Sequence, residues 1–181
     1  MSSPAAASTS PIHSRWRRVA ASVLAVGGAV AFCASFLPFW QAAYPATDID
    51  PASVYVHIPA AELIAIVQDN LSYLESASFI GTAFLALMIW GAPLSMVAVG
   101  TVALLNRRWT PGAFARILAP LLTLLGLGFT IVSCYGYMNP IFGSQGATRS
   151  LADGAFVTIA GYIIALVGVI ALPATATKTR D

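Results

Sequence analysis

The chain has 181 residues, of which 58% are hydrophobic and only 9% are charged. Soluble domains carry about 25% charged residues, so this composition excludes a water-soluble protein with the usual charged surface. The formal net charge of +2 is small. We expect the chain to lie in membrane lipid and to have no nucleic-acid partner.

Four long apolar stretches organise the sequence, at about residues 19–40, 79–105, 113–137 and 155–172. Arg116 is the one charged residue inside any of them. A helix needs about 20 apolar residues to cross ~30 Å of hydrocarbon. The sequence therefore predicts an all-α membrane protein, an antiparallel bundle of four transmembrane helices. This domain covers residues 19–172, between a disordered basic tail (1–18) and a short tail (173–181).

Basic residues gather on one side of the predicted spans. Eight of the nine lie before the first stretch, around the link between the second and third, or after the fourth, together with one of the seven acids. Basic residues in short loops stay cytoplasmic. We therefore predict a multi-pass protein of the plasma (inner) membrane with both termini cytoplasmic. Residues 41–78 and 138–154 then form external loops, and Trp40 marks the external boundary.

The first stretch also has the basic start of a cleaved signal peptide. Its apolar run over residues 19–40 is longer than the 7–15 residues of a signal core, and no suitable cleavage site follows directly. We therefore expect a first span.

The first external loop predicts two elements. Val54–Ile58 alternates and is rich in β-branched residues, which is typical of a short strand. After Pro59, apolar residues recur at helical spacing up to Glu75, opposite acidic and polar ones, which predicts an amphipathic helix. Helices that bind anionic lipid carry Lys and Arg on their polar face. Packing against protein is thus favoured for the apolar face, which consists of Leu63, Ile64, Val67, Leu71 and Leu74.

Small residues follow one face of the fourth span at alternating steps of four and three. Small side chains allow close approach of transmembrane helices. Two interpretations remain open, packing within the bundle and a seam for another subunit. The stripe consists of Gly154, Thr158, Gly161, Ala165 and Gly168.

Two further features concern the spans themselves. Trp90-Gly91-Ala92-Pro93 predicts a kink in the second span, because Pro93 lacks a backbone donor. Cys33 and Cys134 lie at similar predicted depths. They are either small buried side chains or a disulfide, if their helices touch.

The sequence offers no catalytic, cofactor-binding or metal-binding set, and the spans lack the ionisable groups of ion-coupled carriers. We therefore expect a non-catalytic membrane protein, an accessory or scaffold subunit of a larger membrane complex. It would bind a membrane-protein partner or self-associate. The alternative is a homo-oligomeric pore or passive transporter with an acidic external mouth. Its lining would be hydroxyls, among them Thr82, Ser95, Thr101, Thr123, Thr130, Ser133, Thr158 and Tyr162.

Phe36-Leu37-Pro38-Phe39-Trp40 ends the first apolar stretch. It resembles the Leu-Pro-x-Trp that claudins often carry at this place, and the predicted segment order is similar to the claudin-type tetraspan plan. The claudin Gly-Leu-Trp motif and paired loop cysteines have no counterpart in residues 41–78. The resemblance therefore implies a plan of segments and carries over no functional residue.

Overall fold

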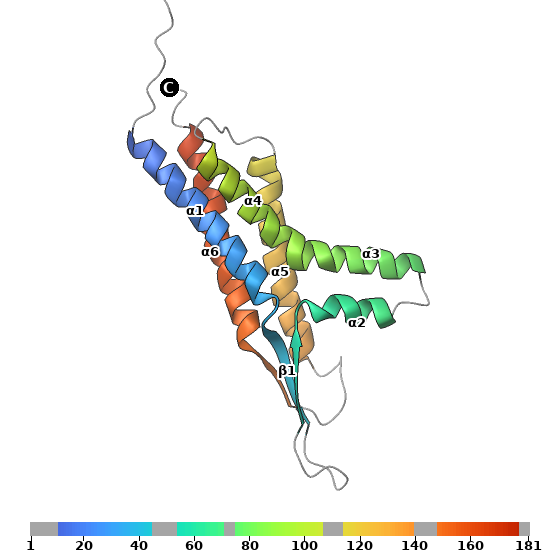
Figure 1. The fold of residues 1–181 in the computed structure, drawn as a ribbon. Helices are drawn as coiled ribbons and strands as arrows, with labels where there is room; N and C mark the ends of the chain where they lie inside the picture. The colour runs from blue at the N-terminus through green and yellow to red at the C-terminus, as the bar shows by residue number, and fades with distance from the viewer. Residues whose placement is uncertain (1–10, 45–53, 71–74, 107–113, 140–147, 178–181) are drawn as a thin grey trace, which may run out of the picture.

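The computed structural model describes residues 11–44, 54–70, 75–106, 114–139 and 148–177. It is mostly helical, with a small three-stranded sheet. Four helices are long and apolar enough to span a membrane, at Arg15–Ala34, Phe79–Leu105, Arg116–Met138 and Asp153–Leu172. The sheet lies at one end of the molecule, and the start of the first helix and the end of the last helix lie at the other (Figure 1). We call these the sheet end and the basic end.

The first helix, α1 (Pro11–Ala34), begins and ends earlier than predicted. It takes in residues 11–18 of the predicted disordered tail and stops six residues before Trp40. Leu37 precedes a proline and is therefore disfavoured in helical conformation, and Pro38 has no N–H to donate. The chain leaves α1 through tight turns, in which the Ser35 and Leu37 amides donate to carbonyls three residues back (3.2 and 3.1 Å).

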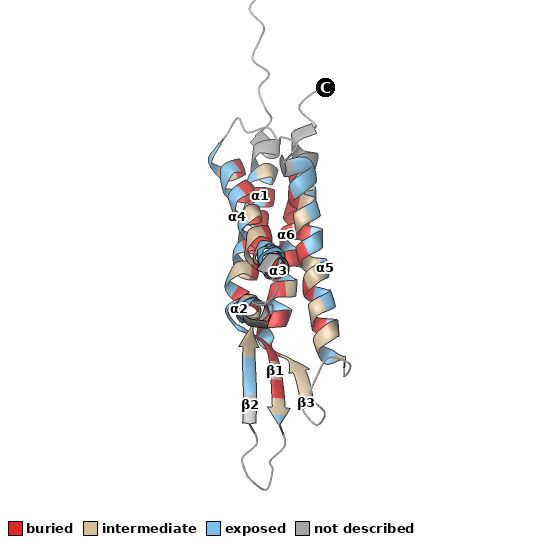
Figure 2. Cartoon of the chain, turned by 90° about the vertical axis from the view of Figure 1, so that its right-hand side faces the viewer, coloured by how far each residue is buried: buried red, intermediate tan, exposed pale blue. Residues whose placement is uncertain are grey.

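The sheet has the strand order β2–β1–β3, with both neighbours antiparallel to β1. β1 (Pro38–Tyr44) covers the predicted end of the first span, up to Trp40, and the start of the first external loop, and β3 (Thr148–Leu151) was not predicted. β2 (Val54–Pro59) confirms the predicted strand. Trp40 pairs with Ile58 on one side and with Leu151 on the other. The sheet thus joins the two predicted external loops at one end of the bundle (Figure 2).

The second span consists of three helical segments, α3 (Glu75–Ala86), the π-helical turn η1 (Leu87–Gly91) and α4 (Ala92–Leu105). The chain bends at η1, so α3 leaves the bundle sideways while α4 packs within it (Figure 1). α2 (Glu62–Asn70) runs beside α3. We call α2 and α3 together the arm. The kink predicted near Pro93 is therefore confirmed, and α3 lies outside the bundle that α4 belongs to.

The remaining elements are η2 (Phe114–Leu118), α5 (Ala119–Met138) and α6 (Asp153–Thr177), which continues past the predicted end at Leu172. α1, α4 and α6 enclose the main core, which includes Leu24, Met96, Tyr162 and Val169. A second cluster lies beneath the sheet around Phe39 and Trp40. α5 lies at the side of the bundle, and its span is only 28% buried (Figure 2).

Candidate functional site

Three members of the small-residue stripe of α6 (Gly161, Ala165 and Gly168) pack against α1 of the same chain, and Gly154 packs against Leu37 and Pro38, which follow α1. A Cβ on Gly161 would lie 2.6 Å from the Ala31 nitrogen, and one on Gly168 would lie 2.5 Å from the Leu24 nitrogen. Ala165 is fully buried, and Thr158 is buried and donates to the Gly154 carbonyl (2.7 Å). The stripe therefore lies inside the bundle, where it brings two helix backbones together.

Two adjacent glycines on α1 pack against different helices, Gly27 against α6 and Gly28 against α4. A Cβ on Gly27 would overlap the Ala165 backbone of α6, whereas one on Gly28 would lie 2.7 Å from the Pro93 carbonyl of α4. Gly100 of α4 packs equally closely on α1, 2.7 Å from the Ala21 carbonyl. α1 is thus held between α4 and α6 by backbone contact on two faces.

The predicted kink of the second span is built around a carbonyl that lacks a helical donor. The Ala92 amide donates to the Leu87 carbonyl, five residues back, in the pattern of a π turn. The next bond in this register would need the N–H that Pro93 lacks. The hydroxyl of Tyr162 on α6 donates instead to the Met88 carbonyl (2.9 Å). A side chain 74 positions away thus satisfies the backbone at the bend.

Tyr162 reaches this carbonyl because α5 leaves room for its ring. It is 1% exposed, the largest of the fully buried side chains. A Cβ on Gly126 would lie 2.5 Å from the Tyr162 oxygen and 2.6 Å from its ring carbon. Gly126, Tyr162 and the π turn therefore form one packed unit across three spans.

A cavity lies between this unit and the sheet. Its volume is about 20 Å³, which is room for a water molecule, and it is partly open to the outside. Its walls come from β1, η1, α5, α6 and the start of α2, so segments far apart in the sequence meet there. The lining includes the aromatic or aliphatic side chains of Phe39, Trp40, Leu63, Met88, Ile89 and Phe129.

Hydroxyl groups line the rest of the cavity wall, and most have their hydrogen committed to backbone. Ser35 donates to the Phe32 carbonyl (2.7 Å) and Thr130 to the Gly126 carbonyl (2.8 Å). Thr158 and Tyr162 donate to the carbonyls given above. The Trp40 Nε1–H, in contrast, is buried without a hydrogen-bond partner in the described part of the chain.

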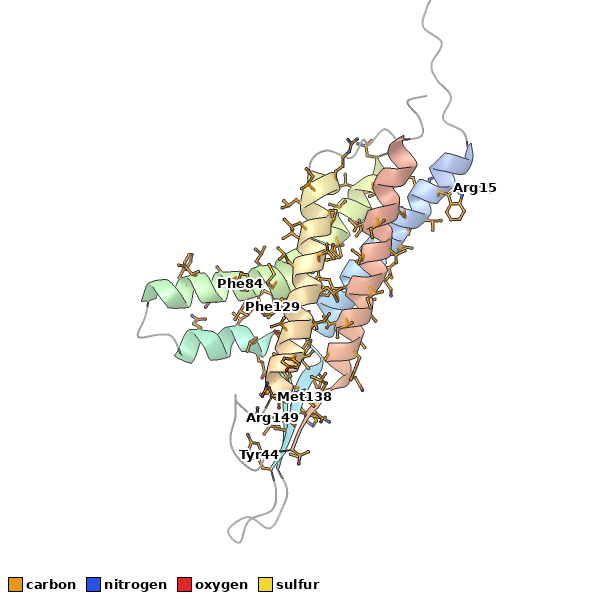
Figure 3. All side chains as sticks on the ribbon, turned by 180° about the vertical axis from the view of Figure 1, so that it is seen from behind. Arg15, Tyr44, Phe84, Phe129, Met138 and Arg149 are labelled. Carbon is orange, nitrogen blue, oxygen red and sulfur yellow. The ribbon has the colours of Figure 1, made fainter. Side chains whose placement is uncertain are left out.

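The arm exposes an apolar surface away from the bundle. Phe79 is 76% exposed and Ile80 67% exposed, both near the start of α3. At the root of the arm, the Phe84 ring packs edge-on against Phe129 of α5, with 5.9 Å between centroids (Figure 3). The arm is thus fixed at its base by an aromatic contact, while the side chains farther out have no cover within the described chain.

The predicted amphipathic helix lies only in part within the described residues. Leu63 and Ile64 lie on α2, are half-buried and pack against the cluster beneath the sheet. Val67 belongs to α2, but its side chain lies outside the described residues, as do Leu71 and Leu74 altogether. The structure describes this helix over Glu62–Asn70. Its apolar face therefore rests, as far as it is described, on protein.

The cysteines and the polar residues of the loops form no second site within the described residues. Cys33 and Cys134 are free thiols, the first exposed and the second buried. Groups of three or more metal-ligating side chains are absent from that part of the chain. Arg149 donates to the Tyr137 carbonyl (3.2 Å) and lies 5.5 Å from the centre of its ring, which joins β3 to α5 (Figure 3).

Sequence reasoning placed Trp40 at the membrane boundary and missed the cavity that it lines. Pro93 indicated the bend beside this cavity, and the cavity wall includes four of the hydroxyl residues named from the sequence as possible pore lining, Thr130, Ser133, Thr158 and Tyr162. No family model, curated protein or solved structure matches the chain.

Proposed function

We propose that this chain is a non-catalytic integral membrane protein that acts as an accessory or scaffold subunit, with a partner membrane protein seated on the arm. One observation carries the proposal: the exposed apolar side chains of α3, which leaves the bundle sideways. The small-residue stripe of α6 already packs mainly against α1, so it is not open to a partner. The arm therefore replaces the stripe as the docking surface.

The charge pattern supports protein rather than anionic lipid as the arm's neighbour. Glu62 is exposed on α2, and the loop of residues 41–78, which contains α2 and the start of α3, carries five acids and no base. Surface helices that bind anionic lipid carry basic residues instead. The same segregation of charge supports a plasma (inner) membrane location with the basic end in the cytoplasm and the sheet end outside.

The hydroxyl groups support the alternative function, a homo-oligomeric pore, less well than the charge pattern supports docking. Thr123, Thr130 and Thr158 are buried inside the bundle, and each donates to a carbonyl of its own helix. Ser95 likewise donates to the Ala92 carbonyl (2.7 Å). Hydroxyls bonded back to their own helices provide little polar surface for a shared channel between subunits.

Site-specific photocrosslinking in the native membrane tests the docking proposal. A photoreactive side chain at position 79 or 80 should give a discrete adduct with another protein. Position 170 is the matched control, because Ile170 is 65% exposed, close to Ile80 at 67%, and belongs to the last part of α6, whereas the arm leaves the bundle at η1. We expect no discrete protein adduct from it. Lipid adducts alone at all three positions would refute docking through the arm, and an adduct with a second copy would favour the pore.

A further inference from the structure

We propose that α3 lies in the plane of the membrane, inside the hydrocarbon of the leaflet at the sheet end, with α2 between it and the polar surface. The inference rests on the proposed spanning of a bilayer by the bundle. It goes beyond docking, because it states where the arm lies whether or not a partner is bound. α4 packs within the bundle, and α3 leaves it sideways (Figure 1). If α4 crosses the membrane, α3 therefore runs along it.

The root of the arm lies well within the spans rather than at their ends. The Phe84 ring of α3 contacts Phe129, which lies nine residues before the end of the α5 span. The Met88 carbonyl of η1 accepts from Tyr162, which lies nine residues after the start of the α6 span. At a rise of 1.5 Å per residue, both counts place the root about 14 Å from the sheet-end limit of the spans.

The second span gives the depth of the bend from the basic end. η1 and α4 together cover Leu87–Leu105, which is a helical length of about 27 Å. The hydrocarbon of a bilayer is about 30 Å thick, so its middle lies about 15 Å from either surface. The bend therefore lies past the middle as counted from the basic end, and below the surface as counted from the sheet end.

The exposed face of α3 has the composition that this depth requires. Ile80, Ala83 and Leu87 are exposed and share one side of the helix. Leu85, on the opposite side, belongs to the cluster against which the α2 side chains pack. After Glu75, α3 carries no charged residue. Its backbone hydrogen bonds are made within the helix, so it can lie in hydrocarbon without unpaired groups. Acyl chains therefore suit this face better than water does.

α2 has the opposite character and lies on the sheet side of α3 (Figure 1). Packed helices lie 8–10 Å apart, so α2 lies about 4–6 Å from the sheet-end limit of the spans. Glu62 and Gln68 are exposed on it, and charged groups are accepted near the polar surface but are costly in hydrocarbon. A partner seated on α3 would thus have to meet it inside the membrane, with an apolar helical surface.

Lipids that carry a quencher at two different depths measure this placement in the purified full chain in phosphatidylcholine nanodiscs. Cys33 and Cys134 would be replaced by alanine, and a fluorophore attached to a single cysteine at position 80, 83 or 87. The three depths should agree within about 3 Å, because positions on one face of an in-plane helix share a depth. A straight span would separate positions 80 and 87 by about 10 Å, and that result would overturn the proposal.

Positions 94, 98 and 105 are the matched controls, because all three are exposed and lie on α4. Their depths should change steadily, by about 12–16 Å in total. Aqueous iodide should quench a fluorophore at position 68 of α2 and spare one at position 80. Iodide quenching at positions 80, 83 and 87 would place α3 in water and overturn the proposal. Equal depths along α4 would overturn the spanning on which it rests. Because these readouts need no partner, a failure of docking leaves them unchanged.

Discussion

One methyl group added at Gly161 tests how closely α6 packs on α1. The new Cβ would lie 2.6 Å from the Ala31 nitrogen and 2.9 Å from the Gly27 carbonyl oxygen. Both are backbone atoms, so no side-chain rotation relieves the overlap. The helices would have to separate by about 0.8 Å for the shorter distance to reach the 3.4 Å at which ordinary contact begins. Overpacking of this kind costs about 1–3 kcal/mol.

Gly128 on α5 is the matched control, because a Cβ there would meet nothing within 4 Å. Alanine is favoured over glycine within a helix by roughly 1 kcal/mol, and this gain applies to both variants. We therefore expect Gly161→Ala to be less stable than Gly128→Ala by about 1–3 kcal/mol. Reversible unfolding by SDS in mixed micelles, followed by tryptophan fluorescence, measures the difference. Equal stability of the two variants would refute backbone contact between α1 and α6.

Two further substitutions test the bend and the root of the arm. Tyr162→Phe leaves the Met88 carbonyl without its donor and should lower the free energy of unfolding by about 1–3 kcal/mol; the same change at Tyr135, which is 72% exposed, should have little effect in the same SDS titration. For the arm, a double-mutant cycle of Phe84→Ala and Phe129→Ala should give a coupling of about 0.5–1.5 kcal/mol, and a coupling near zero would contradict the aromatic contact.

The four candidate spans could be predicted from sequence because the length of each apolar stretch can be counted directly from consecutive residues. The end of the first was wrong, because Phe36–Trp40 is as apolar as the helix before it. Pro38 was the local signal against a helix there. The pairing of β1 with β3, which brings Trp40 opposite Leu151, depends on contacts between segments more than 100 positions apart.

The site was harder to predict than the spans. Pro93 indicated a kink, but the hydrogen bond from the Tyr162 hydroxyl to the Met88 carbonyl at the π turn joins residues 74 positions apart. No local pattern shows that Gly126 leaves space for this ring. From the sequence, Trp40 was predicted to be an aromatic residue at the membrane boundary. Only the fold reveals that its indole lies buried against a cavity.

Cysteine labelling in intact cells tests most directly the central claim that the chain spans the membrane with its sheet outside and its termini inside. Cys33 and Cys134 would first be replaced by alanine, and a single cysteine introduced at Tyr44, at the end of β1 and 40% exposed, or at Ser14. A membrane-impermeant maleimide should label the cysteine at position 44 in intact cells and the one at position 14 only after permeabilisation. Labelling of position 14 in intact cells, with position 44 protected, would contradict the account.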